Sequence, residues 1–456
     1  MAKGERDVAE LLIQDARYER ADVATIRALQ FEKLKHVMEV AWATNPFYRD
    51  HWKEAGVEPS MIRSIEDFTA RVPTVNKATF MADQAREPPY GRRFSHVLEK
   101  GLPLTICTTS GTTGQGVEVH GFTRAEMEIG IKAYAYLFRW AGMKPGDRAF
   151  LNFPITMLGG GRIELFGMEG YGLTVFCVGN YDVKRKLELM ERFRPKCILS
   201  TTSYLGHLSA AAGVSPPPGG VEILMGAGEG AGFSWFERLQ EEWQARIVNQ
   251  FGSTQSRTDH MFTCERGIGT RDHPGMLHNV DPYFLLEVID PATGKQVKDG
   301  EEGEIVITSL FHTDVPLVRC AMRDRAVYRA PQYCSCGRPF SGVEIATIGR
   351  MDDMKKVKGV NIWPQAVDDV MFHMDGVDEY QIVLTSGKDA VDVATARVMP
   401  KPDVGPGAHG GFTAELAKRL RERIGIRFEV ELVPLGTLAR SEYKARRWVD
   451  ERLHKK

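Results

Sequence analysis

Short apolar runs alternate with helical stretches between about residues 100 and 310, and this alternation restricts the fold more than any other pattern in the chain. Two such runs are Cys197-Ile-Leu199, which follows a charged helical stretch at 183–194, and Ile223-Leu-Met225. Runs this short between helical stretches are typical of parallel strands joined by helices. Residues 284–308 are richer in strand-forming side chains. The sequence therefore predicts an α/β fold with mixed sheets and helices.

The pattern changes after about residue 350. Strand-like runs precede a segment rich in proline and glycine, and apolar residues then repeat with helical spacing at Leu416, Leu420 and Ile424. This combination predicts a compact α+β unit. We expect a large N-terminal domain at residues 1–350 and a small C-terminal domain at residues 351–456.

Composition excludes several classes of partner. The 456 residues carry 59 Lys and Arg against 60 Asp and Glu, a formal net charge of -1, so no overall field favours nucleic acid or an anionic membrane. No apolar run approaches the roughly 20 residues of a membrane span, and the charged N-terminus does not resemble a signal peptide. Seven widely spaced cysteines, with one Cys-x-Cys, argue against a disulfide framework and predict a reducing, cytoplasmic setting.

The strongest local signal is the loop Thr108-Thr-Ser-Gly-Thr-Thr-Gly-Gln-Gly116. Its glycines let the backbone approach a ligand closely, and its hydroxyls can donate hydrogen bonds to phosphate oxygens. It is neither a Walker loop, which ends in Gly-Lys-Ser/Thr, nor a dinucleotide fingerprint. The alternative is a flexible loop without a ligand, but the density of hydroxyls beside three glycines favours phosphate binding.

This loop resembles the phosphate loop of the adenylate-forming superfamily, which comprises acyl-CoA ligases, adenylation domains and luciferases. Other segments match in order, between about residues 28 and 452, and indicate the phenylacetate-CoA ligase-like branch. The matching segments are residues 45–56, 188–195, 226–229, 250–255, 316–324, 349–364 and 440–444. So many ordered matches are not expected by chance.

The resemblance implies an ATP-dependent enzyme that converts a small aromatic carboxylic acid to an acyl-adenylate, releases pyrophosphate, and transfers the acyl group to coenzyme A. It implies ATP/AMP, Mg²⁺ and coenzyme A as cofactors, and an adenylate-forming N-terminal domain followed by a mobile C-terminal domain. Such a reaction demands little covalent work of the protein, so positioning and charge stabilisation carry the rate. A homodimer is a further expectation at family level.

The resemblance also implies roles for individual residues. Residues implied for the β- and γ-phosphates are Ser110, Gly111, Thr112, Thr113 and Gly114. Residues implied for the rest of the nucleotide and its metal are Gly226, Ala227, Gly228, Glu229, Phe251, Gly252, Ser253, Gln255 and Asp324. The implied catalytic group is Lys444, Arg350 and Thr254, with Lys444 bridging the α-phosphate and the substrate carboxylate. Asp352 corresponds to the pivot of the small domain. Taken alone, Asp324 and Lys444 would be ordinary surface charges.

Three positions depart from the family pattern. The family's phosphate loop continues with Lys-Pro, where this chain has Gln115-Gly116, and the family's magnesium-ligating Glu is Gln255 here. An amide oxygen can bind a hard cation, but more weakly than a carboxylate. One exchange removes a positive charge and the other a negative charge, so we hypothesise that they are linked. The third departure is Cys320-Ala-Met-Arg, where the family often has Tyr-Arg-Thr-Gly.

Cys334-Ser-Cys336 and the following Gly-Arg resemble a segment that, with an upstream Cys and His, binds structural zinc in many members of this branch. The matching residues are Cys264 and His278, with His273 as a rival. Three thiolates and one imidazole suit tetrahedral Zn²⁺. The alternative is a set of reduced cysteines that pack as small apolar side chains. We expect such core packing for the remaining cysteines, Cys107, Cys177, Cys197 and Cys320.

Two other functions stay open at this stage. The first is an adenylating enzyme that delivers its acyl group to a carrier-protein thiol, an amine or another acceptor, because the phosphate and metal positions are altered. The second is a ligand-binding relative without catalysis, against which the retained Asp324, Arg350 and Lys444 argue. Residues 153–157 and 203–204 are candidate walls of the acyl pocket, although core packing explains them equally well.

Overall fold

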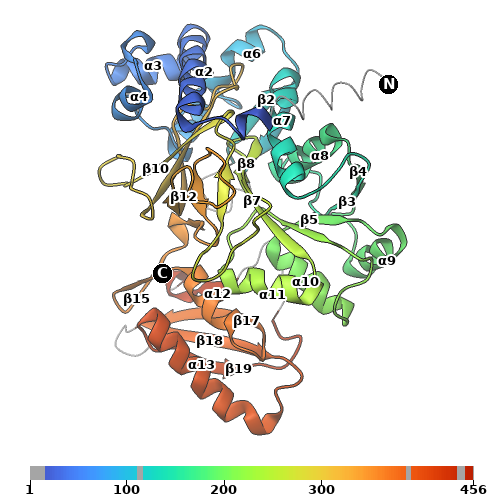
Figure 1. Ribbon diagram of the computed structural model, residues 1–456. Coiled ribbons are helices and arrows are strands. Elements are labelled where there is room, and N and C mark those ends of the chain that lie inside the picture. Colours follow the sequence, from blue (N-terminus) through green and yellow to red (C-terminus); the bar gives the residue numbers. More distant parts are fainter. Residues whose placement is uncertain (1–15, 110–116, 387–391, 439–446, 455–456) are drawn as a thin grey trace. The chain divides into compact units, whose positions relative to one another are not determined.

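The chain forms two compact units in the computed structural model, which describes residues 16–109, 117–386, 392–438 and 447–454 (Figure 1). The first unit runs through Ser200 and includes the later segments Gly219–Gly228 and Arg246–Ile348. The second unit contains Thr201–Pro218, Glu229–Ala245 and the chain from Gly349 onward. The mixed α/β architecture is confirmed, and the second unit also takes in two segments that precede residue 350.

Half of the large sheet in the first unit is parallel, and its strands lie in the order β7-β6-β5-β3-β4. Their bounds are β3 Arg148–Leu151, β4 Thr174–Cys177, β5 Cys197–Ser200, β6 Ile223–Gly226 and β7 Arg246–Ser253. Parallel neighbours need crossover connections, which α8 (Gly159–Tyr171) and α9 (Val183–Phe193) provide. Every residue of β5 and β6 is buried, as their continuous apolar runs require.

The other half of this sheet is mostly antiparallel and continues from β7 in the order β8-β9-β13-β12-β11-β10. The bounds are β8 Thr258–Thr263, β9 Met276–Asn279, β10 Phe284–Ile289, β11 Glu302–Ser309, β12 Cys320–Arg329 and β13 Gly342–Glu344. The strand-rich region expected from residue 284 is therefore confirmed.

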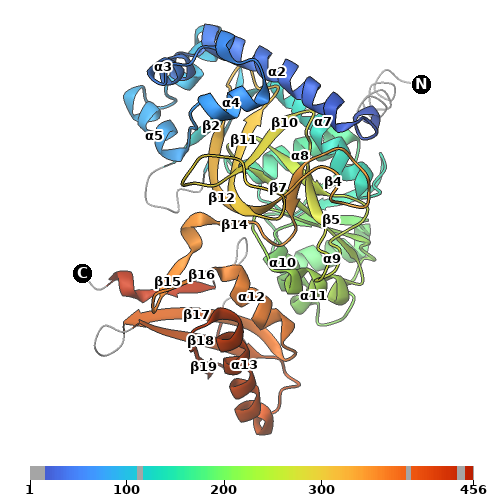
Figure 2. The same cartoon turned by 60° about the vertical axis from the view of Figure 1, so that its left-hand side comes forward.

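Strands β1 (Leu104–Thr108) and β2 (Val119–Thr123) pair as a hairpin and flank the glycine-rich loop in the chain. The predicted phosphate residues 110–114, with Gln115, lie outside the described residues. Helix α7 (Arg124–Trp140) begins directly after β2 with a capping box between Thr123 and Glu126. The helices that precede the hairpin are α2 Val23–Thr44, α3 Pro46–Glu54, α4 Ile65–Arg71, α5 Lys77–Arg86 and α6 Ser95–Glu99. Figure 2 shows α2, α3, α4 and α5 gathered together. No helix in the described part of the chain is long and apolar enough to cross a bilayer.

The second unit is built on a small sheet with the strand order β19-β18-β17-β20. Its elements are α10 Thr202–Ala212, α11 Phe233–Trp243, β14 Gly349–Arg350, β15 Lys355–Val357, β16 Val360–Ile362, α12 Pro364–His373, β17 Val377–Ser386, β18 Asp392–Pro400, α13 His409–Ile424, β19 Glu429–Leu432 and β20 Trp448–Asp450. Helix α11 packs on α12, where the Ser234 hydroxyl donates to the Asp369 carboxylate at 3.2 Å. The predicted helical stripe is confirmed, because Leu416, Leu420 and Ile424 are the buried residues of α13.

Arg447 anchors the chain at the point where the described structure resumes after residue 446. Its Nε lies 2.7 Å from Glu379 Oε1, and its Nη2 donates to Glu379 Oε2 at 3.1 Å. Removing one partner of a buried ion pair leaves the other charge uncompensated, so we expect Arg447→Met to lower the free energy of unfolding of the second unit by about 3–5 kcal/mol. Hydrogen exchange of β17 and β18 measures this effect.

The matched control is Arg419→Met on α13, which breaks a half-exposed pair with Glu415. We expect that change to cost only about 0.3–0.5 kcal/mol, as exposed helical pairs do. Equal losses in the two variants would contradict the anchoring role of Arg447.

Candidate functional site

The ends of the parallel strands place three of the predicted nucleotide residues. Gly226 ends β6 and pairs in register with Asn249 of β7, whose side chain donates to the Gly226 carbonyl at 3.0 Å. The Ala227 amide donates to the Ser200 carbonyl at the end of β5, and Gly228 follows with a φ of 80°. Ligands of open α/β sheets bind outside the carboxyl ends of the strands. Gly226, Ala227 and Gly228 lie at this edge of the sheet.

Strand β7 carries the next predicted residues, Phe251, Gly252 and Ser253. A Cβ at Gly252 would stand 2.1 Å from the Asp259 carboxylate, so only glycine fits there. Ser253 then closes a turn with Ser256, because each backbone amide donates to the other residue's hydroxyl, at 2.9 and 3.1 Å. This turn holds Thr254 and Gln255 at the end of the strand.

A buried acidic cluster lies behind this segment. The Gln250 amide nitrogen donates to Glu164 Oε1 at 2.7 Å and to Asp259 Oδ2 at 2.8 Å. Burial raises the pKa of Asp259 to about 6. Burial and the neighbouring Asp259 raise the pKa of Glu164 well above its usual value. The sequence pattern missed this cluster, because its members come from α8, β7 and β8.

The cluster predicts a pH dependence of stability. An acid whose pKa is raised on folding holds its proton more tightly in the folded state, so its contribution is full at low pH and is lost as the pH rises. For Asp259 the loss runs from its ordinary pKa of 3.8 to about 6. Glu164→Gln keeps the side-chain shape but removes one acid, so we expect a smaller fall in the free energy of unfolding across that window. Urea titrations at a series of pH values measure the fall.

Glu188→Gln on α9 is the control, since the Glu188 side chain is 49% exposed. This control should keep the wild-type pH slope. The same slope in Glu164→Gln as in the wild type would count against a buried titrating cluster.

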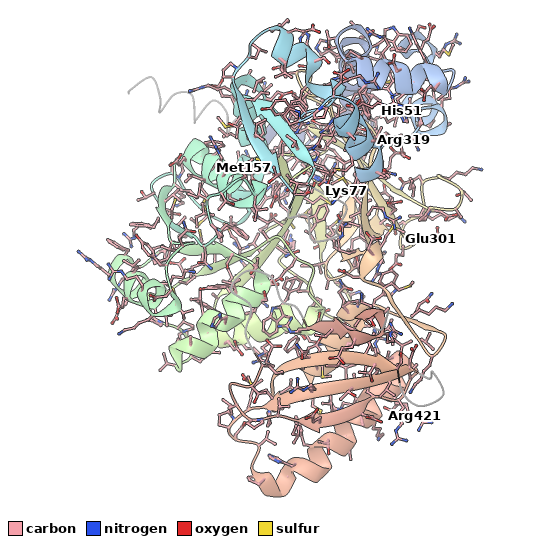
Figure 3. The ribbon with its side chains drawn as sticks, turned by 180° about the vertical axis from the view of Figure 1, so that it is seen from behind. His51, Lys77, Met157, Glu301, Arg319 and Arg421 are labelled. Atoms are coloured by element: carbon pink, nitrogen blue, oxygen red, sulfur yellow. The ribbon has the colours of Figure 1, made fainter. Side chains whose placement is uncertain are left out.

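Gln255 contacts a buried carboxylate that the sequence pattern did not reveal. Its Nε2 lies 3.1 Å from Glu118 Oε2, and Lys77 Nζ lies 3.9 Å from the same oxygen (Figure 3 labels Lys77). His120 Nε2 lies 3.5 Å from Glu118 Oε1. Burial opposes ionisation of Glu118, but His120, Lys77 and Arg93 outweigh it and hold its pKa below the usual value. The only sequence signal is one acidic residue between two valines, directly before β2.

The remaining predicted residues are distributed between the two units. Asp324 lies on β12 in the first unit and is buried. Glu229 belongs to the second unit, where it accepts hydrogen bonds from the Ser203 amide at 2.6 Å and the Thr202 hydroxyl at 3.1 Å, at the first turn of α10. Arg350 lies on β14 in the same unit, 3.8 Å from Asp352. Lys444 lies outside the described residues.

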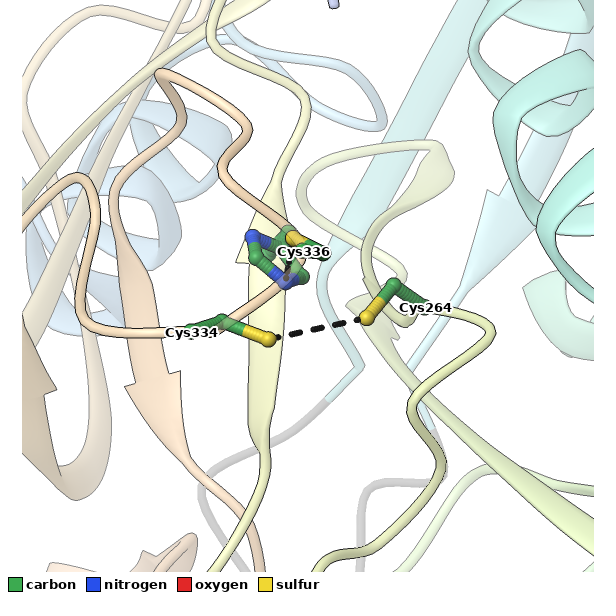
Figure 4. A group of neighbouring side chains, drawn as sticks. Cys264, Cys334 and Cys336 are labelled. Atoms are coloured by element: carbon green, nitrogen blue, oxygen red, sulfur yellow. Dashed lines mark hydrogen bonds between the residues drawn. The ribbon is translucent and has the colours of Figure 1, made fainter.

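The structure brings Cys264, His278, Cys334 and Cys336 together (Figure 4), with all four ligand atoms within 4.8 Å of one another. Cys264 Sγ is 3.7 Å from Cys334 Sγ, and Cys336 Sγ is 3.5 Å from His278 Nε2. His278 comes from β9, and Cys264 follows β8 directly. The rival His273 is exposed and does not belong to this group.

The other cysteines test the expectation of core packing. Cys107, Cys197 and Cys320 are buried, but Cys177 is exposed, so the expectation was wrong for that residue. Cys177 ends β4, which is the edge strand of the sheet and is covered less completely than its neighbours. None of the seven cysteines forms a disulfide.

Comparison with known families gives two matches that follow one another along the chain. Residues 21–311 match the AMP-binding enzyme family, and residues 359–452 match the AMP-binding enzyme C-terminal domain.

Individual relatives match nearly the whole chain. Phenylacetate-coenzyme A ligase of Pseudomonas putida is 28% identical over 446 residues, which cover 95% of this chain and 96% of the relative. The crystal structure of 2-hydroxyisobutyryl-CoA ligase in the postadenylation state, in complex with R3-HIB-AMP, has a TM-score of 0.88 and 28% identity, and the match covers 96% of this chain and 92% of that one. An open conformation of the same ligase, in complex with 2-HIB-AMP and CoA, has a TM-score of 0.69 and 28% identity, with coverage of 95% and 94%.

Proposed function

The chain belongs to the AMP-binding enzyme family, and we propose that it activates a small carboxylic acid with ATP and then transfers the acyl group to coenzyme A. The observation that carries this proposal is the end-to-end match to acid-CoA ligases, one of them a structure that holds an acyl-AMP. In the first step a carboxylate oxygen attacks the α-phosphorus of ATP and pyrophosphate leaves. In the second step the thiol of coenzyme A attacks the acyl carbon and AMP leaves.

The described residues fit the nucleotide part of this reaction. Gly226, Ala227 and Gly228 offer backbone at the carboxyl edge of the sheet, where a planar base can lie against them. We infer that Asp324 accepts hydrogen bonds from the ribose hydroxyls and that Thr254 and Arg350 bind near the α-phosphate. Lys444 supplies the positive charge that stabilises the transition state of the first step.

Gln255 takes the place of the family's magnesium-ligating carboxylate. Its partly exposed side chain carries an oxygen of the type that Mg²⁺ prefers. Mg²⁺, when bound, neutralises charge on the phosphates and on the departing pyrophosphate. The hypothesis that Gln115 and Gln255 changed together remains a prediction, because Gln115 lies outside the described residues.

We infer a structural Zn²⁺ at Cys264, His278, Cys334 and Cys336. Two sulfur ligands of tetrahedral Zn²⁺ stand about 3.7 Å apart, because each bond is about 2.3 Å long. The Cys264–Cys334 separation of 3.7 Å and the Cys336–His278 separation of 3.5 Å agree with the edges of such a tetrahedron. A site with four protein ligands is closed, which fits a structural and not a catalytic metal.

The acid and the acyl acceptor define the test. We propose an aromatic acid, as in the phenylacetate-CoA ligases, although the structural relative acts on 2-hydroxyisobutyrate. Pyrophosphate release is measured with ATP and Mg²⁺ for arylacetic, benzoic and short branched hydroxy acids, with and without coenzyme A. CoA-stimulated turnover with an acyl-CoA product supports the ligase and identifies its acid.

Release without CoA stimulation points to the alternative acceptor, a carrier-protein thiol or an amine. If none of the acids in the panel gives pyrophosphate release, the result counts against the proposed function. Homodimerisation and a cytoplasmic setting remain proposals, the second supported by seven free cysteines.

A further inference from the structure

Glu118 and Gln255 form a polar pair across two distant parts of the chain. The two oxygens of the Glu118 carboxylate lie 3.1 and 3.4 Å from Gln255 Nε2, and the residues are 137 positions apart in sequence. The Glu118 side chain is only 1% exposed, whereas Gln255 is partly exposed at the turn after β7. The carboxylate therefore lies behind the amide.

The chemistry of the two groups decides how the amide is oriented. A carboxylate only accepts hydrogen bonds, while a Gln amide has an NH₂ group that donates and an oxygen that accepts. Lys77 Nζ at 3.9 Å provides a positive charge beside Glu118. The NH₂ group of Gln255 must therefore face Glu118, and its Oε1 must point away from Glu118.

We propose that Glu118 is a positioning residue that turns the oxygen of Gln255 toward the Mg²⁺ of the bound nucleotide. This inference rests on the proposed function, because Mg²⁺ enters with ATP. Without Glu118 the Gln255 amide is free to rotate and to turn its NH₂ group toward the Mg²⁺. The partly positive hydrogens of that group repel the cation. Hydrogen-bonded partners behind a metal ligand orient it and commonly change metal affinity by about 10- to 100-fold.

The pair also accounts for the glutamine at position 255. A glutamate there would bring a second carboxylate within hydrogen-bond distance of Glu118, and the two negative charges would repel each other. Carboxylate and amide are thus compatible in only two arrangements, Glu118 with Gln255 or the reverse. The family has a negative charge at the position of Gln255. In this chain Glu118, which lies behind Gln255, carries that charge.

The test is a charge swap that uses the full chain. We measure ATP affinity by calorimetry with and without Mg²⁺, in the absence of any acid, for Glu118→Gln, Gln255→Glu and the double variant. We expect each single variant to lose about 10-fold or more of the Mg²⁺-dependent gain in ATP affinity. The double variant should recover the wild-type Mg²⁺-dependent gain in ATP affinity or exceed it. In that variant a carboxylate at position 255 faces the metal, and an amide at position 118 holds it in place.

Control variants separate positioning from folding. Glu287→Gln removes another buried carboxylate, which pairs with Arg319 at 3.0 Å, and should alter thermal stability without changing the Mg²⁺ gain. Gln255→Met removes the ligand oxygen from a partly exposed position and should match the loss in Glu118→Gln. If Glu118→Gln alone fails to fold, Gln255→Glu and the double variant still decide the question, because the proposal predicts the larger Mg²⁺ gain for the double variant.

Three outcomes overturn the inference. The first is a wild-type Mg²⁺ gain in Glu118→Gln, and the second is a double variant no better than its single parents. The third is ATP binding by the wild type that does not depend on Mg²⁺, even where pyrophosphate release succeeds. Conversely, ATP binding that depends on Mg²⁺ as expected, without pyrophosphate release, would contradict the proposed function and still support the role of the Glu118–Gln255 pair.

Discussion

Replacing Lys444 with alanine should slow acid-dependent pyrophosphate release by about 100- to 1000-fold, the usual loss when one charge-stabilising donor is removed from a transition state. The first step places negative charge between the α-phosphate and the attacking carboxylate, and Lys444 is the residue assigned to that charge. The second step forms no bond at phosphorus, and its negative charge develops on the acyl oxygen and the departing AMP, not between the α-phosphate and an attacking carboxylate. We therefore expect acyl-CoA formation from a supplied acyl-adenylate to keep most of its rate.

Two measurements distinguish this role from a general loss of structure. Pyrophosphate release is compared with thioester formation in the same preparation, and the ratio between the two rates should change by the full 100- to 1000-fold. Lys418→Ala, at an exposed position of α13, is the control and should leave both rates unchanged. Equal losses in both steps, or pyrophosphate release that survives Lys444→Ala, would falsify the assignment.

Sequence patterns predicted those parts of the fold that local periodicity determines. The apolar runs at 197–199 and 223–225 are β5 and β6, and the charged stretch at 183–194 is α9. Such elements follow from side-chain spacing and burial within a few residues. The Cys and His group could likewise be predicted, because its four residues align with a family segment, and the structure brings them close together.

Other features could not be predicted because they depend on contacts between distant segments. Glu118 meets Gln255 only because the β1–β2 hairpin and the turn after β7 meet in the fold, and neither residue has an unusual neighbourhood in sequence. Helices α10 and α11 alternate with strands of the first unit, yet their contacts assign them to the second. Periodicity says which face of a helix is buried, but not what covers it.

The second large effect concerns stability and follows from the Cys and His group. Metal analysis of the purified protein should return about one Zn²⁺ per chain, held by the four ligands in a closed site. The ligands come from the end of β8, from β9 and from the turn after β12, so one ion would join three segments of the antiparallel half-sheet. Removing it would release all three segments together.

We expect Cys336→Ser to abolish zinc binding and to lower the free energy of unfolding by about 4 kcal/mol or more, a loss of the size that accompanies removal of a structural metal. Chelation of the wild type should lower its thermal midpoint in the same way, and added Zn²⁺ should restore it. Cys177→Ser is the matched control, because Cys177 is exposed and lies outside the group. If the four residues were only packed thiols and an imidazole, both serine variants would lose similar, small amounts of stability, and chelation would have no effect.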